Sequence, residues 1–290
     1  MKDYVIFTDS CADFDEKMVA ELGLQVKPLT FTLKDKEYAN WPDGRDIAFP
    51  EFYKQLREGG ISTTSQVNVA DFIESFRPVL AAGKDILYLG FSSGLSGTVN
   101  SGKLAAEELR AEFADAKIIV VDTLAASLGQ GLLVWHAVQQ KNEGQTIDAV
   151  AAWVENNKLN MAHWFTVDDL NFLKRGGRVS GAAALFGTML NIKPILHVDD
   201  EGHLIPMEKV RGRKQSLNAL VGHMEKTAID ADKQVVFISH GDCLEEAEYV
   251  ASEVKKRLGV KKVYINYVGP VIGSHSGPGT MALFFLASGR

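Results

Sequence analysis

The first half of the chain alternates between short apolar runs and longer amphipathic stretches, a pattern that predicts strands followed by helices. Apolar runs typical of buried strands cover residues 4–8, 24–33, 86–89 and 117–122, and apolar side chains recur at helical spacing within residues 69–76. Further helices are expected at residues 15–22, 49–58, 101–109, 124–142 and 146–157. Strands that alternate with helices in this way build a mostly parallel sheet with right-handed crossovers.

The second half has a different pattern. A strand at residues 162–167 precedes a hairpin whose arms, residues 192–198 and 204–210, flank the turn Asp199-Asp200-Glu201-Gly202. The remaining expected elements are strands at residues 234–239 and 262–268, helices at 216–227 and 245–258, and a loop at 271–280 before the apolar residues 281–286. Neighbouring strands that pair, with helices to one side, indicate an α+β domain. We therefore expect an α/β domain in residues 1–160 and an α+β domain in residues 161–290.

The composition argues against two classes of protein. The chain has 290 residues, of which 46% are hydrophobic, which is enough for a sizeable core. Its 31 basic and 37 acidic residues give a net charge of −6, whereas nucleic-acid binding usually requires a basic patch. No segment approaches the roughly 18 consecutive apolar residues that a membrane span requires. We therefore expect no nucleic-acid partner and no integral membrane segment.

Cysteine and histidine usage favours a reduced, cytoplasmic protein without a metal site. Cys11 and Cys243 are the only cysteines and lie far apart, and the chain enters a strand at once without the pattern of a signal peptide. Five histidines are scattered along the chain and are read as structural or exposed, not as a metal-binding set: His136, His163, His197, His203 and His223. We therefore predict a cytoplasmic location and no metal.

Three polar stretches follow or precede predicted strands and are candidate ligand-binding loops. The richest is Phe91-Ser92-Ser93-Gly94-Leu95-Ser96-Gly97-Thr98, at a strand-to-helix turn where glycines and a helix N-terminus favour a small anion or carboxylate. A second is Ile61-Ser62-Thr63-Thr64-Ser65-Gln66, and a third places His275 between glycines and serines. An imidazole there can bind a carboxylate. The alternatives at this point are a well-capped helix for the first stretch and a loop histidine that caps a helix for the third.

Taken together, these stretches resemble the DegV family of bacterial fatty-acid-binding proteins. The matching segments run in the family's order over nearly the whole chain: Thr8-Asp9-Ser10-Cys11-Ala12-Asp13, Thr64-Ser65-Gln66, Ser92-Ser93-Gly94-Leu95-Ser96-Gly97-Thr98, Leu173-Lys174-Arg175-Gly176-Gly177-Arg178-Val179-Ser180-Gly181, Lys193-Pro194-Ile195-Leu196, His240-Gly241-Asp242 and Gly273-Ser274-His275-Ser276-Gly277-Pro278-Gly279. Each segment is weak alone, but the set is specific. Two positions depart from the family pattern: Val67-Asn68 stands where Pro-Ser is frequent, and Cys11 where Thr or Ser is common.

The resemblance implies a two-domain DegV-like fold that holds a long-chain fatty acid in a tunnel between its domains. It implies that the carboxylate is bound by Thr64, Ser65, Ser92, Ser93 and His275, without a cofactor and without a catalytic nucleophile. The sequence does not separate Ser92 from Ser93, or Thr63 from Thr64, as the side chain that touches the head group.

The resemblance also implies a protein partner. Some family members present the fatty acid to a dihydroxyacetone-kinase-like fatty acid kinase subunit, which forms an acyl phosphate for phospholipid synthesis. By the same resemblance, Arg175 and Arg178 would contact this kinase, and the segment Arg211-Gly212-Arg213-Lys214 would form a second docking surface.

The physical requirements of a fatty-acid site agree with this interpretation. A long-chain carboxylate needs a few polar donors at one end and a dry apolar bore for the rest. At about 0.8 kcal/mol per buried methylene, burial of the chain dominates the affinity. The apolar residues available to line a bore, each of which could equally be ordinary core, are Phe31, Phe165, Phe186, Ile272, Phe284 and Phe285.

Three other functions fit individual features of the sequence. A serine/histidine acyl hydrolase acting on a small ester would use Ser92 or Ser93 with His275, oriented by Asp9 or Asp122, but no Gly-x-Ser-x-Gly elbow is present. A nucleotide-binding enzyme is disfavoured because Ala182-Ala183 stands where a P-loop has Lys-Ser/Thr. A DNA-binding regulator is disfavoured by the acidic balance and by the lack of a helix-turn-helix signature.

Overall fold

A four-stranded parallel sheet forms the centre of the N-terminal half in the computed structural model, which describes residues 2–179 and 191–290. Its strands, in spatial order, are β2 (Gln25–Lys27), β1 (Tyr4–Asp9), β6 (Asp85–Gly90) and β7 (Ile118–Asp122). All of β6 is buried, as expected for a parallel strand that helices cover on both faces. Ile86 and Tyr88 face one hydrophobic core, whereas Leu87 and Leu89 face the other.

Two pairs of helices cover the two faces of this sheet. The pairs are α3 (Val69–Ala81) with α4 (Thr98–Glu112), and α5 (Leu128–Asn142) with α6 (Ile147–Asn157); α1 (Glu16–Leu22) connects β1 to β2. The helix α5 begins four residues later than the pattern predicts. Leu124 and Ser127 have φ values of 50° and 54°, a left-handed conformation that cannot belong to a right-handed helix.

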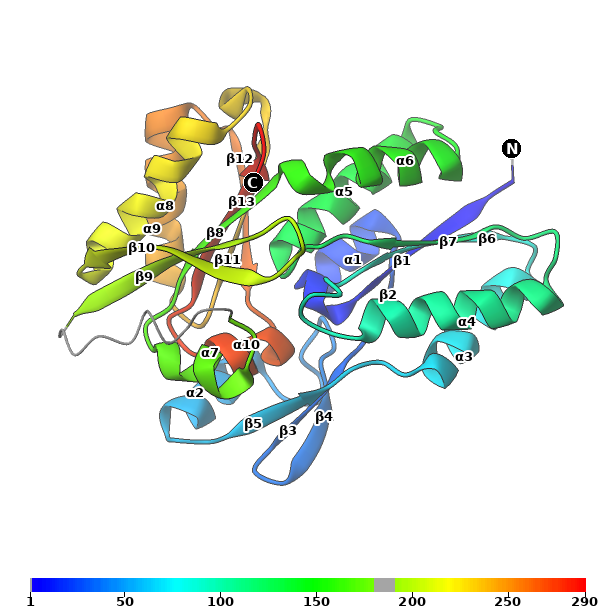
Figure 1. Ribbon diagram of the computed structural model, residues 1–290, viewed down its shortest axis with the longest axis horizontal. Helices are drawn as coiled ribbons and strands as arrows, with labels where there is room; N and C mark the ends of the chain where they lie inside the picture. The colour runs from blue at the N-terminus through cyan, green and yellow to red at the C-terminus, as the bar shows by residue number, and fades with distance from the viewer. Residues whose placement is uncertain (1, 180–190) are drawn as a thin grey trace.

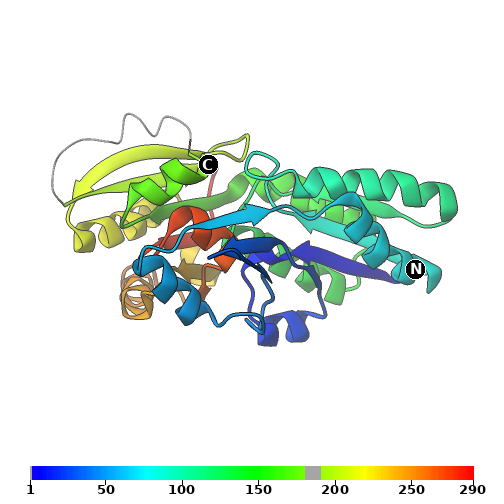
Figure 2. The same ribbon diagram turned by 90° about the horizontal axis from the view of Figure 1, so that it is seen from below.

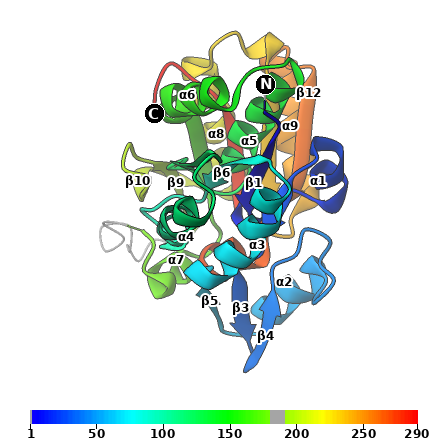
Figure 3. The same ribbon diagram turned by 90° about the vertical axis from the view of Figure 1, so that its right-hand side faces the viewer.

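The expected single strand at residues 24–33 is wrong, because the chain changes sheets within it. β2 ends at Lys27, and β3 (Thr30–Leu33) starts in a different, three-stranded antiparallel sheet. Pro28 lies between them and has no N–H to donate to the ladder of the first sheet. The strand order is β4 (Lys36–Ala39), β3 and β5 (Ser62–Ser65), and α2 (Phe49–Arg57) connects β4 to β5. Figure 3 shows this small sheet projecting below the parallel sheet.

A six-stranded mixed sheet forms the centre of the C-terminal half. Its order is β10 (Leu204–Arg211), β9 (Ile192–Val198), β8 (Met161–Thr166), β13 (Met281–Leu286), β11 (Val235–His240) and β12 (Lys262–Tyr267). β9 and β10 form the predicted hairpin. The outer face packs against α8 (Arg213–Thr227) and α9 (Leu244–Leu258), on the left in Figure 1.

The inner face of this sheet turns toward the N-terminal half and contacts α5. Along β13, Met281, Leu283 and Phe285 belong to the core under α8 and α9, whereas Ala282 and Phe284 belong to the core shared with α5. This alternation follows from the period of two in a strand, which sends successive side chains to opposite faces.

Residues 271–280, expected to be a loop, contain the helix α10 (Pro270–Ser276). Pro270 occupies the first helical position, where its fixed φ is favourable and its missing N–H costs nothing. The glycines of this segment concealed the helix from the sequence pattern. α10 packs against β5, β3 and α7 (Leu170–Gly176), as Figure 2 shows from below.

The predicted fold class, a parallel α/β sheet followed by an α+β sheet, is confirmed. The strands of the parallel sheet all precede residue 160, and those of the six-stranded sheet all follow it. The domain boundary at residue 160 itself stays a prediction. No helix within the described residues combines the length and the apolar character that a membrane span requires.

Candidate functional site

A cavity of about 440 Å³ lies where the carboxyl end of the parallel sheet meets the inner face of the six-stranded sheet. In the strand order β2-β1-β6-β7, the connection after β1 runs to β2 on one side of the sheet, whereas the connection after β6 runs to β7 on the opposite side. Such a switch in strand order opens a crevice at the carboxyl ends of the strands. The volume falls within the range of about 300–1,000 Å³ that is typical of small-molecule sites.

One end of the cavity holds a hydrogen-bonded pair, Thr64 and His275. The Oγ1 of Thr64 on β5 lies 2.8 Å from Nε2 of His275 on α10. These residues are 211 positions apart in the chain and meet because α10 packs on the small sheet. Period-two alternation along β5 turns the neighbouring Thr63 to solvent, so the structure separates the two threonines that the sequence could not.

The His275 imidazole is neutral at physiological pH in this environment. Burial, together with the positive charge of Arg178, lowers the pKa of His275 to about 4. Its Nδ1 is buried without a hydrogen-bond partner among the described residues. A Cβ on Gly176 would lie 2.2 Å from this Nδ1, so the glycine at the end of α7 is what lets the ring sit here.

Further polar groups line the same end of the cavity: Ser65, Gln66, Ser96 and Gly97. The Ser96 hydroxyl lies 2.9 Å from that of Thr98 and accepts a hydrogen bond from the Thr98 N–H. Gly97 lies directly against the Gln66 side chain, because a Cβ there would be 2.2 Å from its Oε1. The sequence predicted the correct loop but not Ser96, which lies six residues after the end of β6 and stands out from the other serines of the loop by no local signal.

Ser92 and Ser93 lie outside the cavity lining. The Ser92 hydroxyl donates to the carbonyl of Gly202, 2.8 Å away, and is buried against the β9–β10 turn. Ser93 is exposed, and its N–H donates to Asp122. The Ser92 carbonyl accepts hydrogen bonds from the N–H groups of Leu95 and Ser96, and these bonds close a turn. Ser92 and Ser93 at the start of the turn lie outside the cavity lining, whereas Ser96 at its end is part of it.

The hydrogen bonds also bear on the hydrolase alternative. The hydroxyl partner of His275 is Thr64, neither Ser92 nor Ser93. Asp9 is fully buried and accepts from the Tyr88 hydroxyl and from the N–H groups of Phe91 and Cys11, so its oxygens are committed at the carboxyl ends of β1 and β6. Asp122, the other candidate, accepts from the N–H groups of Ser93 and Leu124. Within the described residues, no hydrogen bond of His275 therefore joins it to a serine or aspartate of the hydrolase alternative.

The walls of the cavity are mostly apolar. Of the residues predicted to line a bore, Phe165, Ile272 and Phe284 do so. Phe31 and Phe285 pack in separate hydrophobic cores, and Phe285 does so because it follows Phe284 on a strand and faces the other way. Phe186 lies outside the described residues.

The three arginines predicted to contact a partner occupy different environments. Arg178 is exposed yet lines the cavity, where its Nη1 donates to the Gly176 carbonyl at 2.6 Å. It therefore lies at the mouth, close to His275. Arg175 stacks on Phe172, with 4.7 Å from the guanidinium to the ring centre, and faces a second hollow of about 450 Å³. Arg211 is exposed at the end of the edge strand β10.

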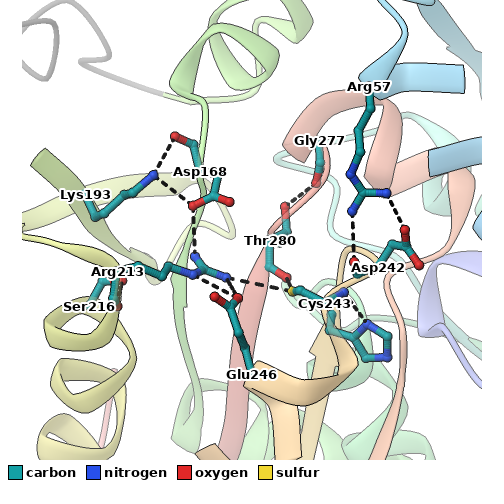
Figure 4. Close-up of polar contacts among 11 residues, drawn as sticks. Arg57, Asp168, Lys193, Arg213, Ser216, Asp242, Cys243, Glu246, Gly277 and Thr280 are labelled. Carbon is teal, nitrogen blue, oxygen red and sulfur yellow. Dashed lines mark hydrogen bonds and ion pairs between the residues drawn. The ribbon is translucent and has the colours of Figure 1, made fainter. Parts of the chain in front are cut away.

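A network of ion pairs lies behind the second hollow (Figure 4). Asp168 accepts from Lys193 at 2.8 Å and lies 3.5 Å from Arg213, which also pairs with Glu246. Arg213 is thus committed within the protein, so the basic segment at residues 211–214 is not a uniform docking surface. On the other side, Arg57 pairs with Asp242 and joins α2 to the C-terminal half.

Asp199, Glu201 and His203 are the described residues that come within reach of a common metal ion. The turn itself accounts for their arrangement, because Asp199 accepts hydrogen bonds from the N–H groups of both Glu201 and His203. The predicted absence of a metal stays a prediction.

Comparison with known proteins places the chain in a family. A family model described as "Uncharacterised protein, DegV family" matches residues 3–288. The chain belongs to the DegV family. A DegV domain-containing protein of Clostridium perfringens is 48% identical over 286 residues, which are 99% of this chain and 98% of that protein. The family predicted from the motifs is thereby confirmed.

Solved DegV structures share the fold of this DegV chain over nearly its whole length. A DegV family protein from Thermus thermophilus, described by its fatty-acid binding, is 34% identical and covers 99% of this chain and 100% of its own, with a TM-score of 0.88. DegV of Bacillus subtilis, described as a fatty acid binding protein, is 26% identical with a TM-score of 0.85 and covers 99% of this chain and 100% of its own.

Proposed function

We propose that this DegV protein binds a long-chain fatty acid in the cavity between its two large sheets. The observation that carries the proposal is a cavity that combines the Thr64–His275 pair with a mostly apolar lining. The relatives described as fatty-acid binding, at 34% and 26% identity over the whole chain, support the same ligand class.

In this proposal the carboxylate lies beside Thr64 and His275, within reach of Ser65 and Ser96. Hydroxyl and imidazole donors can hold a carboxylate without a salt bridge, and Arg178 at the mouth adds a favourable field. Of the predicted head-group residues, Thr64, Ser65 and His275 line the cavity, whereas Ser92 supports it from behind through Gly202 and Ser93 faces solvent. Ser96 takes the place of Ser92 and Ser93 in the proposed site.

The binding test uses two adjacent threonines. Thr64→Val removes the hydroxyl that pairs with His275, whereas Thr63→Val makes the same change on the opposite face of β5. Loss of one hydrogen bond to a charged group should weaken palmitate binding by roughly tenfold to a hundredfold in Thr64→Val only. Equal affinities of the two variants, measured by calorimetry on delipidated protein, would refute the head-group position.

We further propose that the protein presents the bound carboxylate to a dihydroxyacetone-kinase-like fatty acid kinase subunit, which phosphorylates it to an acyl phosphate. The family resemblance suggests this partner, and the exposure of Arg175, Arg178 and Arg211 is compatible with docking around the mouth. Arg175 faces the second hollow and does not line the cavity. Arg175→Ala should therefore keep its fatty acid but slow acyl phosphate formation by the kinase, and Lys17→Ala on α1 should change neither.

A further inference from the structure

The helix α10 turns two rows of side chains toward the cavity. Val271 and His275 form one row, Ile272 and Ser276 form the other, and all four residues line the cavity. Residues four apart lie above one another on the same face of a helix. Each row therefore begins with an apolar residue and ends with a polar one, about 6 Å further along the helix axis.

The two polar residues lie at nearly the same level of α10. Successive residues of a helix rise by about 1.5 Å and differ in direction by about 100°. Ser274 contacts Ser62 of β5, and His275 contacts Thr64 of the same strand. Ser276 follows His275 in the same sense of rotation, so its side chain lies on the side of the imidazole that faces away from β5.

The Ser276 hydroxyl is buried and has no hydrogen-bond partner among the described residues. Only 4% of Ser276 is exposed. A serine in a helix usually donates to the carbonyl three or four residues earlier. The similarly buried Ser274 does so, with 2.7 Å to the Pro270 carbonyl, and it lies outside the cavity lining. The hydroxyl of Ser276 is instead available to a molecule in the cavity.

An unpaired hydroxyl at this place indicates which ligand atom it would bind. A buried polar group without a partner costs free energy, which an acceptor atom on the ligand recovers. The hydroxyl has one proton to donate and carries no charge. An ionised carboxylate has about four acceptor positions on its two oxygens, more than the Thr64–His275 pair can fill.

We propose that Ser276 donates a hydrogen bond to the carboxylate oxygen that faces away from Thr64. In this arrangement Thr64 and Ser276 hold the head group from the two sides of His275. Ser276 thereby selects a head group with two oxygens over one with a single oxygen, such as that of a long-chain alcohol. The inference rests on the proposed fatty-acid function and adds a specificity-determining residue to its head-group site.

The experiment compares palmitate with hexadecanol, which has the same chain length and one head-group oxygen. Both ligands are delivered from cyclodextrin to the full, delipidated chain, and their dissociation constants are measured by competition. Ser276→Ala should weaken palmitate binding roughly tenfold, as expected for one hydrogen bond to a charged group, and should leave hexadecanol binding unchanged. Ser274→Ala, on the same helix but outside the cavity lining, should keep the wild-type ratio of the two constants.

The thermal stability of the empty protein gives a second readout, in which the two variants differ. Ser276→Ala removes a hydroxyl that has no partner, so the midpoint of unfolding should stay the same or rise. Ser274→Ala removes the partner of the Ser62 hydroxyl, 2.7 Å away, and should lower the midpoint. A lower midpoint in Ser276→Ala would overturn the proposal, because the hydroxyl would then serve the fold.

The binding outcomes separate this inference from the proposed function. Palmitate binding by the wild type, with an unchanged ratio of the two constants in Ser276→Ala, would overturn the role of Ser276 and leave the fatty-acid function intact. The same holds if Ser276→Ala weakens palmitate and hexadecanol equally, since the residue would then shape the cavity without contacting the carboxylate. Absence of palmitate binding by the wild type would overturn the fatty-acid function, and the role of Ser276 with it.

Discussion

Narrowing the far end of the cavity should set an upper limit on the length of the bound chain. Ala126 lines the cavity, and its N–H lies 3.4 Å from Nε2 of His163, well along β8 from the head-group pair. Ala126→Leu adds three carbon atoms at this point. We expect the leucine to take the space of the methylenes that the distal part of a long ligand would otherwise place there.

The expected loss follows from the displaced hydrocarbon. Three methylene-sized positions at about 0.8 kcal/mol each correspond to about 2.4 kcal/mol, or roughly fiftyfold in Kd. Ligands too short to reach Ala126 should keep their wild-type binding free energy. The free energy of unfolding of the empty protein should stay the same or rise, because the leucine fills an existing cavity and leaves packed neighbours in place.

The assay is a series of saturated fatty acids of increasing length, titrated into wild type, Ala126→Leu and the exposed Ala20→Leu on α1. A plot of binding free energy against chain length should bend at a shorter length in Ala126→Leu and be unchanged in Ala20→Leu. An equal loss of affinity for short and long fatty acids, or no loss of affinity for long ones, would refute the proposed path of the acyl chain from the Thr64–His275 pair toward Ala126.

Three further changes test the electrostatics and packing of the site. Gly176→Ala should weaken fatty-acid binding by roughly tenfold, because the new Cβ would meet Nδ1 of His275, whereas Gly222→Ala, which meets nothing, should leave the calorimetric Kd unchanged. Because burial raises the pKa of Asp13 from 3.8 to about 8, the folded wild type holds a proton in this pH interval that the unfolded chain has released. The free energy of unfolding of the wild type therefore falls as the pH rises from 3.8 to about 8. Asp13→Asn has no such proton and should become more stable relative to the wild type over the same interval. Urea unfolding at several pH values checks this, and a difference independent of pH would contradict it. Arg178→Ala should raise the pKa of His275 above about 4 in the empty protein, because the positive charge of Arg178 is one of the two causes that lower it. An NMR titration of the His275 ring that shows the same pKa in both proteins would contradict an influence of Arg178 on this ring.

The sequence was sufficient to predict the elements whose patterns are local. The buried strands around residues 86–89 and 117–122 and the hairpin around residue 200 appear where the apolar runs and the turn residues put them. These signals depend only on neighbours in the chain. The change of sheets at Pro28 depends instead on which distant strand is available for pairing, and the sequence pattern carries no information about that.

The candidate site was predictable as loops but not as side chains. Ser92 and Ser96 stand in one motif, and only the closed turn between them decides that Ser96 faces the cavity while Ser92 bonds to Gly202. The Thr64–His275 pair was invisible for a related reason, because its two members are 211 positions apart in the chain and meet only through the packing of α10 on the small sheet.

Mass spectrometry of an organic extract of the purified protein tests the central claim most directly. The account predicts about one equivalent of a long-chain fatty acid per protein, lost on Thr64→Val and retained on Thr63→Val. An empty extract, together with no uptake of added palmitate by the delipidated protein, would contradict the account.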